Sequence, residues 1–260
     1  MRKWHRVIGV AAVCVGVLAP AAVASAAPQY VALGDSYSSG VGTRVFYSES
    51  GSCSRSPDAY GPKIAAARGY TLSFQACSGA KTTDVNANQL GTLSSTTSLV
   101  TISIGGNDAG FSNVILNCAL YFFTCGSAVN EANSFIATKL GGLLDTTYNN
   151  IRSRATTAHV VILAYPHLFT SDGKTCNANF LTSGNEKKLN ETGDKLDAVV
   201  KARAEAHGFT FVDTRSAFLA HEVCSSSEWL NGQSNPLSES YHPNVSGQAD
   251  FTSQIEGVLP

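Results

Sequence analysis

The chain has few charges, no excess of one sign and only one long apolar run. Asp, Glu, Lys and Arg make up 14% of its 260 residues, with 18 basic against 19 acidic side chains. A balance of this kind gives no electrostatic footprint for a nucleic acid. Repeats, linkers and low-complexity stretches are also lacking, which indicates a single α/β domain with a sizeable core.

Several motifs that would point to other chemistry are missing. The chain has seven cysteines but no Cys-x-x-Cys pair, and its six histidines are scattered. We therefore expect no metal site, and no motif for a cofactor is present. The Gly-x-Ser-x-Gly sequence of α/β-hydrolases is lacking too, which argues against that fold.

The single long apolar run belongs to a stretch with the three parts of a secretory signal peptide. A basic start is followed by the uncharged run Val7–Leu18 and by the small residues Ala24-Ser25-Ala26. The run is shorter than the roughly 18 to 20 residues of a membrane-spanning helix. We predict a signal peptide at 1–26 and a secreted, extracellular domain at 27–260. Loss of three basic residues leaves 15 basic against 19 acidic side chains, a net charge of −4.

The cysteines fit export. After cleavage an even number remains, and an exported chain with paired cysteines is expected to form disulfides. The residues alone allow 15 pairings of six cysteines. They are Cys53, Cys77, Cys118, Cys125, Cys176 and Cys224.

Strand-like apolar runs alternate with helix-like segments. The expected strands are 30–33, 71–76, 99–104, 159–164 and 209–212, and the expected helices are 59–68, 128–154, 185–207 and 244–258. This alternation predicts βαβ units with right-handed crossovers. We expect a three-layer α/β/α sandwich around a five-stranded, mostly parallel sheet.

Polar residues beside glycines follow three of the expected strands, where ligands bind in such sheets. Ser36 follows the first strand, and a serine there is a nucleophile only if a base takes its proton. His242 is the candidate base, because Pro243 holds it in an extended loop. Asn107 and Gly79 follow two other strands and offer N–H groups to a developing oxyanion.

Four motifs resemble a known family when they are taken together and in order. They are "GDSYSSG" at 34–40, "CSGA" at 77–80, "IGGND" at 104–108 and "YHP" at 241–243. They are similar to blocks I, II, III and V of the SGNH, or GDSL, hydrolases, and closest to the small secreted lipases and esterases of actinomycetes. The resemblance covers essentially the whole mature chain and implies a flavodoxin-like SGNH hydrolase fold.

The resemblance also implies roles for individual residues. Ser36 is the expected nucleophile of a Ser-His acyl-enzyme mechanism, with His242 as base and then acid. The N–H groups of Ser36 and Gly79 and the Asn107 side chain are the expected oxyanion hole. Asp35 and Asp108 are expected to hold turns and loops.

The group that orients His242 is less plain. Many family members have Asp three residues before the histidine, where this chain has Glu239. In the lipases that the chain most resembles, a backbone carbonyl takes this role, which here falls to Ser240. We favour the carbonyl, because the orienting group need only fix the imidazole tautomer and position. Glu239 remains the alternative.

Consecutive disulfides are a further implication of the resemblance. They pair Cys53–Cys77, Cys118–Cys125 and Cys176–Cys224.

The expected substrate is a lipid ester, which makes the protein a triacylglycerol lipase or esterase. Phospholipase A1 and carbohydrate acetylesterase are the alternatives on the same fold, and a non-catalytic secreted binding protein is the alternative from another class. The segment "CALYFFTC" at 118–125 either lines the acyl groove, touches a lipid surface transiently, or packs on the core. We expect no nucleic-acid partner, no transmembrane segment, and a monomer.

Overall fold

The computed structural model describes residues 1, 3–4, 26–120, 124–174 and 181–260. A five-stranded sheet with the strand order β2-β1-β3-β4-β5 forms its centre, and every neighbouring pair is parallel. The strands are β1 Gln29–Gly34, β2 Thr71–Phe74, β3 Thr97–Ser103, β4 His159–Leu163 and β5 Thr210–Val212. The predicted five-stranded sheet is thus confirmed, and it is parallel throughout.

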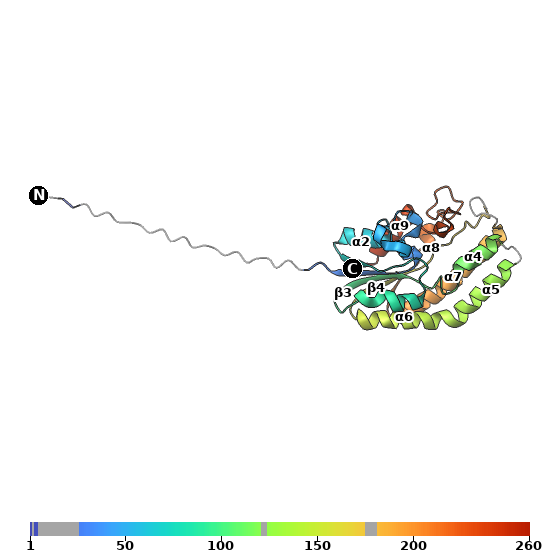
Figure 1. Ribbon diagram of the computed structural model, residues 1–260, viewed down its shortest axis with the longest axis horizontal. Helices are drawn as coiled ribbons and strands as arrows, with labels where there is room; N and C mark the ends of the chain where they lie inside the picture. Colours follow the sequence, from blue (N-terminus) through green and yellow to red (C-terminus); the bar gives the residue numbers. More distant parts are fainter. Residues whose placement is uncertain (2, 5–25, 121–123, 175–180) are drawn as a thin grey trace.

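Helices cover both faces of the sheet, as predicted, and give three layers (Figure 1). The longer ones are α2 Tyr60–Arg68, α4 Phe111–Leu120, α5 Cys125–Phe135, α6 Gly141–Arg154, α7 Ser183–Ala206 and α9 Val245–Glu256. The short ones are α1 Ser36–Ser39, α3 Thr82–Asp84 and α8 Arg215–Phe218. Among the described residues, no helix is both long enough and apolar enough to span a membrane.

Successive side chains of a strand pack alternately into two separate hydrophobic cores, one on each face of the sheet. Tyr30 and Ala32 of β1 point to the face covered by α2, α8 and α9. Val31 and Leu33 point to the opposite face, which is covered by α6 and α7. All four side chains are fully buried, as expected for a parallel strand with helices on both faces.

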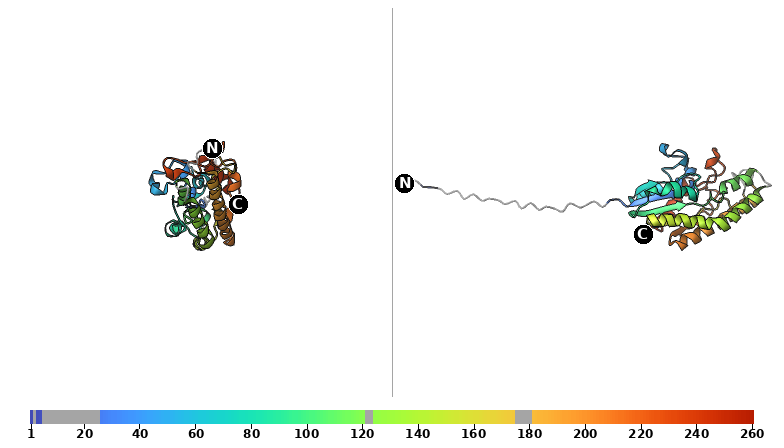
Figure 2. Two further views of the ribbon diagram at one scale, coloured as in Figure 1. Left: turned by 90° about the vertical axis from the view of Figure 1, so that its right-hand side faces the viewer. Right: turned by 60° about the horizontal axis from the view of Figure 1, so that its bottom comes forward.

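Two helical regions differ from the prediction. The expected helix 128–154 is α5 and α6 joined by one π-helical stretch, Ile136–Leu140, and it begins earlier, at Cys125. No helix was expected at 111–120, yet α4 forms there. Figures 1 and 2 show α4, α5 and the start of α7 reaching beyond the sheet. This extension supplies the apolar wall of the site described below.

The strand order places the loops of interest together. The chain leaves β1 for the outer strand β2 and then returns past β1 to β3, so the loops after β1 and β3 meet at the point where the strand order reverses. Gly34 at the end of β1 pairs in register with Ser103 of β3. Ser36 and Asn107 therefore emerge at the same edge of the sheet.

The predicted signal peptide lies almost entirely outside the described residues. Cleavage after Ala26 stays a prediction.

Candidate active site

Ser36 is the first residue of α1, directly after β1. Asp35 caps this helix, because its carboxylate accepts a hydrogen bond from the Tyr37 N–H at 3.0 Å. Only 8% of Ser36 is exposed. Since α1 has four residues, its free N–H groups matter more here than any helix dipole.

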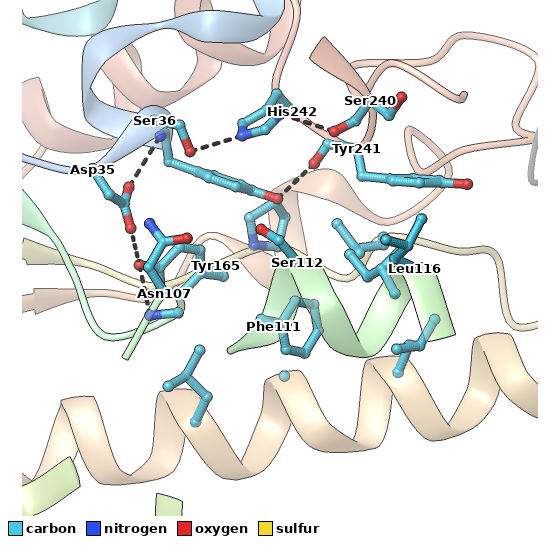
Figure 3. A pocket seen from close by; sticks show the side chains of 18 of the residues that line it. Asp35, Ser36, Asn107, Phe111, Ser112, Leu116, Tyr165, Ser240, Tyr241 and His242 are labelled. Atoms are coloured by element: carbon cyan, nitrogen blue, oxygen red, sulfur yellow. Dashed lines mark hydrogen bonds between the residues drawn. The ribbon is translucent and has the colours of Figure 1, made fainter. Parts of the chain in front are cut away.

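Ser36 and His242 are 206 residues apart in the chain but lie in direct contact (Figure 3). The distance from Ser36 Oγ to His242 Nε2 is 2.7 Å, and His242 Nδ1 lies 2.8 Å from the carbonyl oxygen of Ser240. A carbonyl only accepts, so Nδ1 carries the proton and Nε2 is left to accept from the Ser36 hydroxyl. This is the tautomer that a general base needs.

The Glu239 carboxylate is engaged elsewhere. Its Oε2 lies 3.1 Å from Nε of Arg44 in an ion pair. The structure therefore brings the Ser240 carbonyl to the imidazole and directs the Glu239 side chain to Arg44.

Asn107 lines the same cleft as Ser36 and His242. Its Nδ2 donates to the carbonyl of Ala80 at 3.1 Å, which fixes the amide and leaves a second N–H available. Gly79 comes directly before Ala80 and has a φ of +78°, a backbone conformation that favours glycine. The Asn107 contact thus ties the Gly79 turn to the loop after β3. Gly79 itself is not among the residues that line the cleft.

The two acidic residues of the motifs hold loops, as expected. The Asp108 carboxylate accepts from the backbone N–H of Thr82 at 3.0 Å and from its hydroxyl at 2.6 Å. The buried Asp35 carboxylate accepts from Tyr37 and from the hydroxyls of Ser103 and Tyr165. Burial raises the pKa of Asp35 to about 6, and these hydrogen bonds oppose the rise.

Tyr165 is a site residue to which sequence reasoning assigned no role. Its hydroxyl donates to Asp35 and accepts from the Gly106 N–H at 3.2 Å, so it joins the loop that carries Ser36 to the loop that carries Asn107. The available signal was its position directly after the fourth strand.

Asn231 is a second missed residue, and it holds the His242 segment in place. Its Nδ2 donates to the carbonyls of Gly42, at 2.8 Å, and Glu239, at 3.3 Å, and its backbone N–H donates to the His242 carbonyl at 2.9 Å. Gly42 lies so close that an added Cβ would be 2.3 Å from the Pro243 carbonyl oxygen. Asn231 therefore clamps the segment after the nucleophile to the segment of the base.

An apolar cleft of about 230 Å³ opens beside these groups. One wall comes from α4 and α7, and Tyr241 and Leu237 lie near His242. The main apolar lining residues are Phe111, Ile115, Leu116, Ala119, Leu189 and Leu196. The segment 118–125 was one candidate for lining this groove, and its Ala119, near the end of α4, does line the cleft. Its residues 121–123 lie outside the described residues.

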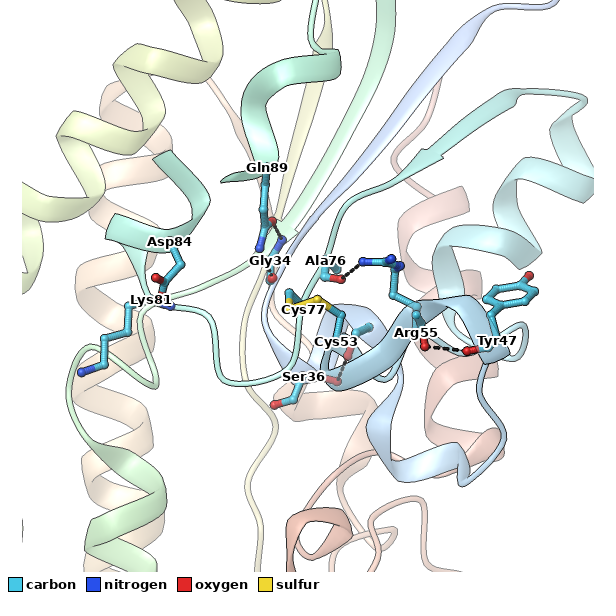
Figure 4. Close-up of a disulfide and its surroundings, with 12 residues drawn as sticks. Gly34, Ser36, Tyr47, Cys53, Arg55, Ala76, Cys77, Lys81, Asp84 and Gln89 are labelled. Atoms are coloured by element: carbon cyan, nitrogen blue, oxygen red, sulfur yellow. Dashed lines mark hydrogen bonds between the residues drawn. A yellow bond between two sulfur atoms is a disulfide. The ribbon is translucent and has the colours of Figure 1, made fainter. Parts of the chain in front are cut away.

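The Cys53–Cys77 and Cys118–Cys125 bridges are present. Cys176 of the third expected bridge lies outside the described residues. Figure 4 shows Cys53–Cys77 beside Ser36, and the Cys53 carbonyl accepts from the Ser78 N–H at 3.1 Å. The described part of the chain holds no group of three or more His, Cys, Asp or Glu side chains that could bind a metal ion.

Removing the Cys53–Cys77 bridge is expected to weaken both the fold and the site. The bridge spans 24 residues, and a loop of this size corresponds to about 3 kcal/mol of unfolding free energy in the chain-entropy model. The double variant Cys53→Ser, Cys77→Ser is expected to lose this unfolding free energy, as measured by denaturant unfolding. Its kcat should also fall, because Ser78 and Gly79 are no longer anchored by the bridge. Serine at both Cys118 and Cys125 is the control, since that bridge closes a much shorter loop. Equal losses in the two double variants would contradict the expectation.

The pH profile should reflect a histidine that is hard to protonate. Burial lowers the pKa of His242 from 6.5 to about 4, although the carbonyl acceptors at Ser240 and Glu239 oppose this. Below its pKa the imidazolium cannot accept the Ser36 proton, so kcat/KM for an uncharged ester should fall only well below pH 6.5. Asp35→Asn, which keeps a capping oxygen, identifies any part of the acid limb that comes from Asp35. An acid limb at or above 6.5 that survives in this variant would disprove the assignment.

Comparisons with known proteins identify the family of this chain. Residues 32–249 match the GDSL-like Lipase/Acylhydrolase family. The chain is 46% identical over 234 residues to Lipase 1 of Streptomyces coelicolor, covering 89% of this chain and 86% of that protein.

Solved structures are similar as well. The phospholipase A1 of Streptomyces albidoflavus NA297 superimposes with a TM-score of 0.87, and the extracellular lipase of Streptomyces rimosus with 0.86. Each is 42% identical over 90% of this chain and 100% of its own. The resemblance found in the motifs is confirmed, and the chain belongs to the GDSL-like lipase/acylhydrolase family.

Proposed function

We propose that this carboxylic-ester hydrolase cleaves lipid esters with Ser36 as nucleophile and His242 as general base. The observation that carries the proposal is the line from the Ser240 carbonyl through the imidazole to Ser36 Oγ, with contacts of 2.8 and 2.7 Å. It ends in an apolar cleft that Asn107 also lines. A hydroxyl held by a correctly protonated histidine, next to a fixed amide, suits acyl transfer.

The reaction proceeds through an acyl-enzyme. Ser36 Oγ attacks the ester carbonyl carbon while Nε2 of His242 takes its proton. The oxyanion accepts from the Ser36 N–H and from Asn107 Nδ2, and the resemblance to the family adds the Gly79 N–H as a third donor. Collapse breaks the bond to the alcohol, which leaves with the proton from His242. Water, deprotonated by the same nitrogen, then attacks the acyl group and releases the acid and Ser36.

The Ser240 carbonyl is the proposed orienting group, in place of a third carboxylate. It holds Nδ1–H and so selects the tautomer, and the ion pair of Glu239 with Arg44 supports this assignment.

The cleft walls favour triacylglycerol or other lipid esters as substrates. Phe111 and Ile115 of α4 offer apolar surface to an acyl chain, and none of the cleft-lining residues of α4 and α7 is charged. Leu116 and Leu237 line the cleft yet are 42% and 61% exposed. We propose that these two leucines touch the lipid surface transiently while a substrate enters.

Phospholipase A1 activity is the second candidate, because a phospholipase A1 is among the structures 42% identical to this chain. A panel of emulsified triacylglycerol, phosphatidylcholine vesicles and acetylated sugar separates the possibilities. Fastest turnover of triacylglycerol, with a rise above its solubility limit, supports the lipase with surface contact. Fastest turnover of the vesicles supports the phospholipase, and selective deacetylation of the sugar would overturn both.

We further propose that the protein is secreted after cleavage behind Ala26 and acts as a monomer. The N-terminal pattern, the disulfides and the extracellular lipase among the relatives support export. Mass spectrometry of protein from culture medium tests the cleavage, and light scattering tests the monomer. An N-terminus still at Met1, or a dimer mass, would contradict these proposals.

A further inference from the structure

Gly193 lies in the middle of α7, where glycine is unfavourable. After proline, glycine is the residue least suited to a helix interior, because it loses the most backbone freedom on folding. Its backbone is ordinary helix, since it does not appear among the residues with positive φ. A Cβ built at this position would meet no atom within 4 Å. Neither strain nor packing within the protein therefore requires glycine here.

Two other glycines near the site have an evident packing reason. A Cβ on Gly34 would lie 2.5 Å from the carbonyl oxygen of Ser103, and one on Gly42 would collide with Pro243. Gly193 differs because the space beside it is open. That space belongs to the cleft, which Gly193 lines.

The neighbours of Gly193 on the same helix face show what the missing side chain does. Leu189, four residues before it, and Leu196, three residues after it, also line the cleft. On this face of α7, two leucine side chains project into the cleft, and between them Gly193 leaves a notch without a side chain. Across the cleft, α4 contributes Phe111, whose ring points toward the long helix in Figure 3, and Ile115.

This notch lies in the apolar arm of the cleft. The lining from α4 and α7, here called the first arm, is mostly apolar, with Ser112 and Asn190 as its polar members. The lining from the segments before His242, here called the second arm, includes Gln233 and Ser238. An acyl chain favours the first arm, because burying its methylene groups there removes apolar surface from water. The alcohol part of the ester is left to the second arm.

We propose that Gly193 is a specificity-determining residue, whose absent side chain keeps the α4–α7 arm deep enough for a long acyl chain. The proposal rests on the proposed function of Ser36 and His242. It assigns the acyl part of the substrate to this arm and gives the unfavourable helix residue a purpose. A side chain at this position would shorten the arm between Leu189 and Leu196.

The test compares Gly193→Ala and Gly193→Leu with Gly142→Ala and Gly142→Leu. Gly142 lies in α6, is exposed, finds no atom within 4 Å of an added Cβ, and does not line the cleft. Both alanine variants remove a helical glycine and are expected to raise the Tm by about 2–4 °C. The readout is kcat/KM on p-nitrophenyl butyrate, octanoate and dodecanoate.

Gly193→Leu is expected to lower the dodecanoate-to-butyrate ratio of kcat/KM about tenfold or more, and Gly193→Ala severalfold. The Gly142 variants should keep the ratio of the unmodified protein. An unchanged ratio in folded Gly193→Ala overturns the inference, and so does an equal loss on all three esters. If Gly193→Leu fails to fold, Gly193→Ala decides alone. Failure of the unmodified protein to hydrolyse any of these esters would instead refute the proposed function.

Discussion

His242→Gln is expected to lower kcat by about 10⁴- to 10⁶-fold, the loss typical of removing the base of a serine hydrolase. The imidazole is the group that accepts the Ser36 proton, at an Oγ to Nε2 distance of 2.7 Å. Glutamine keeps a polar side chain of similar length but cannot act as a base at neutral pH. The measurement is steady-state hydrolysis of p-nitrophenyl butyrate, with the Tm recorded to exclude misfolding.

Glu239→Gln is the matched variant three residues earlier. Its carboxylate pairs with Arg44, so we expect kcat to change less than about tenfold. A loss comparable with that of His242→Gln would mean that the carboxylate orients the imidazole during turnover. The Ser240 carbonyl would then lose the role proposed for it.

Asn107→Ala is expected to lower kcat by about 10²- to 10³-fold, or roughly 3 to 4 kcal/mol of transition-state stabilisation. One N–H of the amide is held by the Ala80 carbonyl at 3.1 Å, which leaves the other to donate to the oxyanion. Because the oxyanion exists only in the tetrahedral state, KM should change little. Initial rates over a range of p-nitrophenyl butyrate concentrations give both constants.

Asp108→Asn is the control for the shape of this loop. Asp108 holds the same loop to Thr82 through contacts of 3.0 and 2.6 Å, and asparagine keeps one of its accepting oxygens. A small effect is expected on kcat. If the two variants lose activity equally, the shape of the loop matters, and Asn107 is not an oxyanion donor in its own right.

The fold was predictable because its strands are short, continuous apolar runs separated by helical periods. Burial on both faces demands apolar side chains in the middle of β1, so the run Tyr30–Leu33 could be recognised without a partner strand. The candidate site residues were predictable for a related reason. Ser36, Gly79 and Asn107 each follow a strand, and the carboxyl ends of parallel strands share one edge.

What could not be predicted depends on contacts between distant segments. Glu239 and Ser240 both lie shortly before His242 in the sequence. Arg44, almost 200 residues earlier, pairs with the Glu239 carboxylate, and the Ser240 carbonyl contacts the imidazole, which no local pattern could show. The clamp of Asn231 on Gly42 spans 189 residues and leaves no local pattern.

The α4 wall was missed for a different reason. Attention went to the run between Cys118 and Cys125, of which Ala119 lines the cleft, while residues 121–123 lie outside the described residues and their role stays a prediction. The helix begins at Phe111, directly after the Gly-rich turn, and brings Ile115 and Ala119 to the cleft at helical spacing. A turn sequence that also starts a helix gives little warning of its length.

Covalent labelling tests the central claim most directly. The protein is treated with a fluorophosphonate, which phosphonylates an activated serine, and the labelled peptide is identified by mass spectrometry. The account predicts one adduct, on Ser36, and its loss in Ser36→Ala and in His242→Gln. An adduct on another serine, or labelling that persists at full rate in Ser36→Ala, would contradict it.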